Sequence, residues 1–244
     1  MLRAFWRWIL LALIASFALQ FFFVLRVISM RWIDPQSTAF ERSEIFQVAT
    51  QSDKSFAWKQ QWLSYEQISD HMKRAVIASE DGDFSYHDGV EWEAIEKAWQ
   101  RNTRAEQIAE RRSKRTGKVI PPKVVGGSTI TQQLAKNLFL SGERTFLRKG
   151  QEFVITFALE AFLPKERILE IYLNSVELGQ GVFGVEAAAQ HYYRKSASKL
   201  SPYEAARLAV MLPRPKFFER VPNSAYLSSR AQTIVARMGD AELP

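Results

Sequence analysis

The sequence contains no cysteine among its 244 residues. This absence excludes disulfide bonds, thiol nucleophiles and zinc sites built on cysteine. It does not identify a compartment, because a cysteine-free protein suits a reducing or an oxidising environment equally. Histidine is also scarce: the three histidines, His71, His87 and His191, form no HExxH pair. A zinc protease site is therefore not indicated.

Common nucleophile and phosphate-binding motifs are missing as well. There is no GxSxG elbow and no GxxxxGK[ST] loop, and these would mark a serine hydrolase and a P-loop enzyme. Gly179, Gly181 and Gly184 lie together, but a dinucleotide site would need such glycines between a strand and a helix. No convincing series of strands and no internal repeat is present. We therefore expect a mainly α fold, with one domain or at most two small ones.

The composition is that of a globular protein with a basic excess. Hydrophobic residues make up 47%, charged residues 24%, and the formal net charge is +7. Such a charge favours phosphates, nucleic acid or acidic lipid surfaces without choosing among them. Seven basic residues lie between Arg101 and Lys118, and the stretch 101–123 is typical of a solvated helix end followed by a flexible loop. Only Trp99 lies nearby to stack on bases, so we expect no nucleic-acid partner.

The N-terminal part contains an uncharged run from Trp8 to Leu25. At about 1.5 Å per residue, a helix of this length just spans the hydrocarbon core of a bilayer. We therefore predict a cytoplasmic stub and transmembrane anchor at 1–31, a juxtamembrane linker at 32–63 and the main domain at 64–244. A signal peptide cleaved near Ser16-Phe17-Ala18 is an alternative. A buried soluble helix is a weaker one, because the run has no polar face.

Glu80 stands out among the carboxylates. Ser64 and Gln67 form a capping-box pattern, and the helix that follows runs to Glu80 before Asp81-Gly82-Asp83 breaks it. The C-terminal end of a helix is unfavourable for a carboxylate, because the helix dipole repels it. This unfavourable placement suggests a functional role for Glu80.

A second group of residues combines polar and basic side chains. Ser128 is expected to cap a helix over Thr129–Leu140, and the uncharged run Ser128–Gln133 beside Lys136 suits an anionic or sugar ligand. Arg148 and Glu152 are four residues apart. By themselves they are most simply interpreted as a surface ion pair. A reaction at an anomeric carbon, however, needs a base for the incoming hydroxyl and neutralisation of the leaving group.

The C-terminal half predicts four further helices. Their approximate ranges are 147–162, 165–173, 184–195 and 202–212. The last has the clearest boundaries, because Ser201 and Glu204 form a capping box, Pro202 occupies the first helical position and Pro213 ends it.

Five segments of the chain carry a specific resemblance. They are Glu80–Gly89, Gly127–Asn137, Arg148–Glu152, Lys165–Asn174 and Gly184–Ala188 with Tyr192-Tyr193. In this order they resemble the motifs of the peptidoglycan glycosyltransferase family, glycosyltransferase family 51. They span about residues 75–215, and five motifs in sequence are far more specific than one. Gln151 departs from the third motif, where some members have a basic residue, so that contact is expected to be lost. The stretch 101–123 is longer than the family usually has.

The resemblance implies a lysozyme-like, mostly helical fold and the polymerisation of lipid II into glycan strands. Glu80 would remove the proton from the acceptor's sugar 4-hydroxyl, with inversion at the donor's anomeric carbon. Glu152 would lie near the departing undecaprenyl diphosphate and help its release, with a divalent metal, Mg or Mn, as a candidate cofactor near it. Asp81, Phe84 and His87 would shape the site around Glu80. The residues that would hold the sugars and diphosphates are Ser128, Thr129, Gln132, Gln133, Lys136, Asn137, Arg144, Arg148 and Lys149.

The resemblance also implies a location and partners. The chain would cross the bacterial inner membrane once, with its catalytic domain on the periplasmic side. It would meet lipid II, the lipid-linked growing strand, membrane lipids and other cell-wall synthesis or division proteins. No transpeptidase domain fits after residue 244, so a monofunctional member of the family is expected.

Two other functions remain open at this point. A hydrolase or lytic transglycosylase needs a carboxylic acid to protonate a sugar leaving group, but it does not need the cations at 136, 148 and 149. A non-catalytic scaffold would need neither Glu80 nor Glu152.

Overall fold

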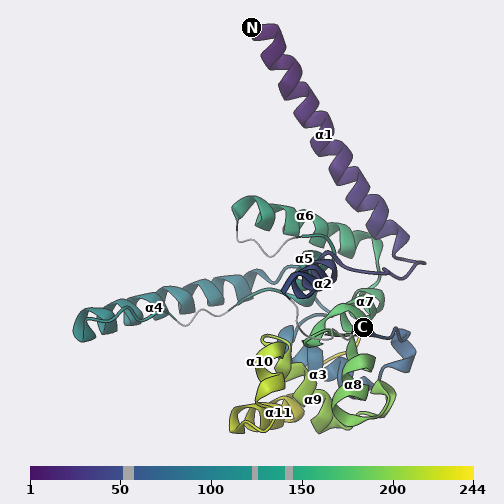
Figure 1. The fold of residues 1–244 in the computed structure, drawn as a ribbon, viewed down its shortest axis with the longest axis vertical. Coiled ribbons are helices and arrows are strands. Elements are labelled where there is room, and N and C mark those ends of the chain that lie inside the picture. Colours follow the sequence, from purple (N-terminus) through teal and green to yellow (C-terminus); the bar gives the residue numbers. More distant parts are fainter. Residues whose placement is uncertain (52–57, 123–125, 141–144) are drawn as a thin grey trace.

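The computed structural model describes residues 1–51, 58–122, 126–140 and 145–244. It is mainly helical, as predicted. A body of packed helices carries two long projections, α1 (Leu2–Ser29) and α4 (Trp92–Thr116) (Figure 1). The α2, α5 and α6 helices lie on the side of the body nearer α1, and α8 to α11 lie on the far side.

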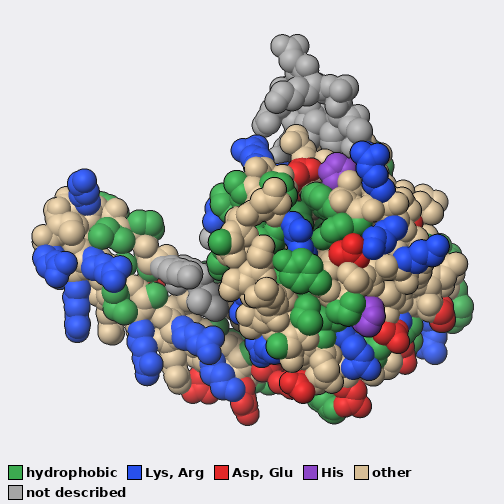
Figure 2. Space-filling model, turned by 90° about the horizontal axis from the view of Figure 1, so that it is seen from below, with side chains coloured by type: hydrophobic (Ala, Val, Ile, Leu, Met, Phe, Trp, Pro, Cys, Tyr) green, Lys and Arg blue, Asp and Glu red, His purple; other side chains and the backbone are tan. Residues whose placement is uncertain are grey.

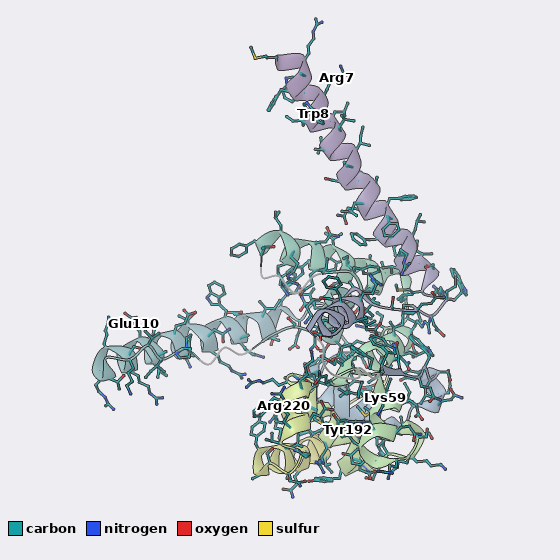
Figure 3. All side chains as sticks on the ribbon, in the orientation of Figure 1. Arg7, Trp8, Lys59, Glu110, Tyr192 and Arg220 are labelled. Carbon is teal, nitrogen blue, oxygen red and sulfur yellow. The ribbon has the colours of Figure 1, made fainter. Side chains whose placement is uncertain are left out.

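The first projection, α1, agrees with the predicted anchor. Within the described ranges, Arg3–Ser29 is the one helix long and apolar enough to cross a membrane. Its apolar window is not buried against the rest of the protein, so the alternative of a buried soluble helix is wrong. Figure 3 shows Arg7 and Trp8 far from the body, near the free end of α1.

The other end of α1 is docked on the body. Val27 and Met30 are buried in the core, and the Phe23 ring meets the Phe139 ring at 5.3 Å. Gln20 and Gln151 exchange two amide hydrogen bonds of 2.7 and 2.9 Å. Gln151, at which we expected a basic contact to be lost, is therefore hydrogen-bonded to an amide of α1 instead. The two helices that receive α1 are α5 (Ile130–Phe139) and α6 (Phe146–Phe162).

The helices predicted for the C-terminal half are confirmed. Besides α6 they are α7 (Lys165–Ser175), α8 (Val185–Tyr193) and α9 (Pro202–Met211). The α9 helix begins with the expected capping box between Ser201 and Glu204 and with proline in its first turn. Two helices not predicted, α10 (Pro215–Arg220) and α11 (Ala225–Arg237), and the 3-10 turn η2 (Ala197–Lys199) complete this part.

A small sheet was not predicted. Its strands are β1 (Lys59–Gln60), β2 (Glu177–Gly179) and β3 (Val182–Phe183), in the order β1-β3-β2. The β1 strand is parallel to β3, with Lys59 opposite Val182, and β2 is antiparallel to β3. Strands of two or three residues are too short to give a period-two pattern.

The region before Glu80 is more divided than predicted. Residues 32–63 contain β1 and also α2 (Ala39–Gln51), which packs on α5. The capping box of Ser64 and Gln67 exists, but it opens only the 3-10 turn η1 (Tyr65–Gln67). The α3 helix (Asp70–Glu80) begins afresh, with Ser69 as its N-cap.

The second projection, α4, corrects the prediction for 101–123. The helix continues to Thr116 and ends at Gly117, which has a left-handed φ of +66°. The predicted flexible loop therefore begins later than expected. The returning chain passes close to α4: a Cβ on Gly127 would lie 3.0 Å from the Ala94 carbonyl oxygen. Figure 2 shows many Lys and Arg side chains along this arm.

Packing in the body brings the ends of three helices together. The α3 helix packs on α9, and α9 packs on α11. The α5 helix packs on α6 and α7. At the C-terminal end of α3, Glu80 accepts a hydrogen bond from Gln133 of α5, and side chains from α3, α5 and α6 line a common cleft.

Candidate active site

A cleft of about 670 Å³ lies between α3, α5 and α6. Apolar side chains from α2 and from the end of α9 form part of its wall. Arg144 lies outside the described residues, and Asp81, Phe84, His87 and Thr129 do not line the cleft. The predicted site residues that line it are Glu80, Ser128, Gln132, Gln133, Lys136, Asn137, Arg148, Lys149 and Glu152.

Glu80 is the last residue of α3, as predicted. The Gln133 amide Nε2 donates a hydrogen bond of 2.9 Å to Glu80 Oε2, and the Ser79 hydroxyl lies 3.4 Å from Oε1. Burial raises the pKa of Glu80, while the hydrogen bonds from Gln133 and Ser79 oppose the rise. A carboxylate with a raised pKa is a stronger base for a hydroxyl proton than an exposed one.

Asp81 fixes the neighbourhood of Glu80 from behind. One of its oxygens accepts from His87 Nε2 and the other from the Ile130 backbone N–H, each at 2.8 Å. His87 Nδ1 accepts from the Gly89 N–H at 3.0 Å, so Nε2 carries the proton. Asp81 thus joins the end of α3 to the start of α5. Asp81 and His87 support the site and are not placed to touch a ligand in the cleft.

The cap of α5 corrects one prediction. Thr129, and not Ser128, is the N-cap, and it forms a capping box with Gln132. The Thr129 hydroxyl also donates 2.6 Å to the Gly89 carbonyl oxygen. The displacement by one residue leaves Ser128 on the cleft wall. The pattern Thr-x-x-Gln is a complete capping box, and it is therefore a better signal than an isolated serine.

Two predicted residues of this region have different environments. Phe84 is fully buried and has the Lys165 ammonium over its ring at 4.5 Å, so it belongs to the core. Gln132 Nε2 is buried on the cleft wall without a hydrogen-bond partner in the described part of the chain. An unsatisfied buried donor is costly, and a ligand oxygen in the cleft would satisfy it.

Glu152 is the centre of a buried ion cluster. It is only 3% exposed. Arg148 Nη1 donates to one oxygen at 2.7 Å, and Lys149 Nζ donates to the other. The interpretation as a surface ion pair is therefore wrong. Because two cations meet one carboxylate, the cluster has an excess positive charge that faces the cleft, where Lys136 adds another.

This donor set does not fit a divalent metal held by the protein. Both oxygens of Glu152 are already paired with cations. Among the residues that the structure describes, no three His, Cys, Asp or Glu side chains converge, whereas Mg²⁺ and Mn²⁺ require several oxygen ligands. The cluster suits an anion instead.

Several residues of the site were missed by the sequence analysis. Tyr172 lies beneath the cleft, and its hydroxyl donates 2.9 Å to Gln133 Oε1. It lies within the fourth motif, but nothing in its spacing connects it with Gln133. Phe40, Leu212 and Pro213 form apolar wall. Only Pro213 carried a signal, as the end of a helix.

The arrangement separates two chemical capacities along one cleft. The part of the wall on α3 and α5 has a carboxylate with a raised pKa among neutral donors, and the part on α6 has fixed cations around a buried carboxylate. A base can activate a hydroxyl, and preorganised cations can stabilise an anionic leaving group.

Comparison with known proteins also indicates a transglycosylase. A family model described as transglycosylase matches residues 47–239. A protein of Herminiimonas arsenicoxydans is 50% identical over 97% of this chain and 95% of its own length. A protein of Burkholderia thailandensis is 50% identical over 94% of the chain and 84% of its own length. A protein of Bordetella pertussis is 53% identical over 86% and 82%. All three are named biosynthetic peptidoglycan transglycosylase.

Proposed function

The chain belongs to the transglycosylase family, and on this premise we propose that it is a peptidoglycan glycosyltransferase that polymerises lipid II. The acceptor is lipid II, and the donor is the lipid-linked growing strand. The product is a lengthened glycan strand, and undecaprenyl diphosphate is released. The observation that carries this proposal is the pairing, in one cleft, of a base at Glu80 with a cation cluster at Glu152.

The reaction uses the two ends of the cleft in turn. Glu80 takes the proton from the acceptor's 4-hydroxyl, and the oxygen forms a bond to the donor's anomeric carbon. The bond from that carbon to the diphosphate oxygen breaks on the opposite face, and the diphosphate leaves with the electron pair. The anomeric configuration inverts from α to β.

In this proposal Glu152 acts through its two cations. It receives one hydrogen bond from Arg148 and one from Lys149, so it fixes both basic groups at the cleft wall. These cations, with Lys136, neutralise the charge that develops on the diphosphate. Preorganised charges of this kind need no rearrangement during the reaction.

The membrane placement follows from the lipid-linked substrates. We propose that α1 crosses the inner membrane once and that the body lies on the periplasmic side. We favour a retained anchor over a cleaved signal peptide, because cleavage near residue 18 would leave the exposed apolar side chains of Phe21, Phe22 and Leu25 at a new N-terminus. Other cell-wall synthesis or division proteins are proposed partners.

The test is polymerisation of lipid II by the full chain in detergent. We expect glycan strands on a gel from the wild type, and a loss of about 10³-fold in rate for Glu80→Gln. Thermal unfolding shows whether this variant is folded. A folded Glu80→Gln variant with near wild-type rate would refute the role of Glu80. Degradation of preformed glycan without polymer growth would point to the lytic reaction instead.

A further inference from the structure

Tyr172 is a buried phenol with a narrow set of contacts. Its side chain on α7 is 1% exposed, and its hydroxyl donates to Gln133 Oε1 at 2.9 Å. No other hydrogen bond of this hydroxyl is present within the described ranges. Burial raises the pKa of Tyr172 well above its ordinary value, so the hydroxyl keeps its proton and remains a donor.

Gln133 passes this contact on to Glu80. Its amide Nε2 donates to Glu80 Oε2 at 2.9 Å. Side chains from α7, α5 and α3 are thereby joined in one line, in which every donor faces an acceptor. The sequence separates the two bonded pairs by 39 and 53 residues, so only the fold brings them together.

The Tyr172 hydroxyl determines which way the Gln133 amide faces. A glutamine amide has donors on one side and an acceptor on the other. If the amide were turned over, its oxygen would face the carboxylate of Glu80, and two acceptors would meet without a proton between them. Because Tyr172 offers a donor, the amide oxygen is drawn toward α7 and the NH₂ group toward Glu80.

We propose that Tyr172 is a positioning residue for the transfer reaction, and that its hydroxyl locks the Gln133 amide so that Oε2 of Glu80 is hydrogen-bonded and Oε1 receives the proton. This inference rests on the proposed function and on Glu80 as its base. Among the residues that the structure describes, Oε1 has only the long 3.4 Å contact with the Ser79 hydroxyl, which leaves it available to the acceptor's hydroxyl.

Loss of the lock has a predictable direction. Without the Tyr172 hydroxyl, part of the Gln133 amides turn their oxygen toward Glu80 and disfavour its ionised form. The pKa of Glu80 then rises further. Since the base must be ionised to act, the activity lost on acidification is lost at a higher pH.

The experiment compares two tyrosine variants of the full chain in detergent. Tyr172→Phe removes the lock, and Tyr192→Phe is the matched control. Tyr192 is half-buried rather than fully buried, but among the described residues its hydroxyl likewise has one hydrogen bond, 2.8 Å to the Leu178 carbonyl oxygen, and it lies on the far side of the body (Figure 3). For Tyr172→Phe we expect the acid limb of the kcat–pH profile to move up by about half a unit to one unit. KM should change little, and Tyr192→Phe should keep the wild-type limb. Equal limbs in the two variants would overturn the proposal.

A double variant tests whether Tyr172 acts through Gln133. Gln133→Leu alone should move the acid limb at least as far as Tyr172→Phe, and adding Tyr172→Phe to it should move the limb no further. An additive shift would show that Tyr172 acts by another route and would overturn the proposal. These results are distinct from failure of the proposed function, which would appear as a wild type that does not polymerise lipid II at any pH.

Discussion

Glu80 and Glu152 line the same cleft, but the side chains around them have opposite character. Glu80 has neutral donors, Gln133 and Ser79, and burial raises its pKa. Glu152 is more deeply buried, and Arg148 and Lys149 hold both of its oxygens. One carboxylate is kept ready for a proton, and the other is engaged by positive charge.

This difference supports the proposed division of roles between the two carboxylates. Two carboxylates in unlike environments can divide acid–base work and charge stabilisation between them. The same difference also predicts that removing each negative charge will affect stability in opposite directions. Burial disfavours the ionised form of Glu80, whereas Glu152 balances the charges of two cations.

The largest expected effect on stability comes from Glu152→Gln. The variant leaves Arg148 and Lys149 without their carboxylate, so both the rate of polymerisation and the stability should fall. We expect a rate loss of about 10²-fold and a decrease of about 2 kcal/mol in the free energy of unfolding. Initial rates and thermal unfolding in detergent measure both. An unchanged melting temperature would contradict the ion cluster described here.

A smaller effect of opposite sign is expected for the stability of Glu80→Gln. Because burial opposes the ionised form of Glu80, replacing it with a neutral side chain should raise the free energy of unfolding by about 1 kcal/mol at pH 7. The raised pKa means that the gain should shrink as the pH falls and Glu80 takes up its proton. Melting temperatures over a pH series check this, and a constant difference at all pH values would contradict it.

Glu177 tests whether a raised pKa by itself identifies a base. Burial raises its pKa to about 7, and Lys216 Nζ lies 3.4 Å from its Oε1, but Glu177 does not line the cleft. Its folded-state pKa exceeds the unfolded value, so its contribution to stability should decline as the pH rises from about 4.5 to about 7. Relative to wild type, Glu177→Gln should therefore become more stable as the pH rises through this window, by about 1 kcal/mol in the free energy of unfolding. Melting temperatures over a pH series measure this gain, and polymerisation should be unchanged. A large loss of rate would extend the functional site beyond the cleft.

The smallest effect is expected on the α4 arm. Glu110 accepts from Lys114 at 2.7 Å, four residues on, in the same spacing as Arg148 and Glu152. Both side chains are exposed, so solvent and salt screen the pair. Glu110→Gln should leave the melting temperature unchanged within error. Because it matches Glu152→Gln in spacing, it isolates the contribution of burial.

Much of the fold could be predicted because the signals were local. The residues next to Glu80 and Pro202 are enough to predict the C-terminal end of α3 and the start of α9. By contrast, α2 and the small sheet depend on distant partners. Lys59 pairs with Val182 across more than a hundred residues, and no window of sequence contains both.

The site was predictable in composition but less so in arrangement. The motifs contain the residues that line the cleft, but they do not say which of them face inward. Ser128, predicted to cap α5, lines the cleft instead, and the neighbouring Thr129 is the N-cap. Glu152 has the spacing of a surface pair, and only packing reveals that it is buried. The line from Tyr172 through Gln133 to Glu80 requires three helices to be in place.

The amide pair between Gln20 and Gln151 bears on how the enzyme is held at its membrane. A single-span protein is commonly described as a domain attached to its membrane helix by a flexible linker. Here Gln20 of α1 is hydrogen-bonded to Gln151, which directly precedes Glu152 on α6. In the proposed placement this amide pair would lie near apolar lipid, where little water competes for its hydrogen bonds. In the proposed membrane placement, the tilt and rotation of α1 in the bilayer would therefore fix the orientation of the cleft relative to the membrane plane.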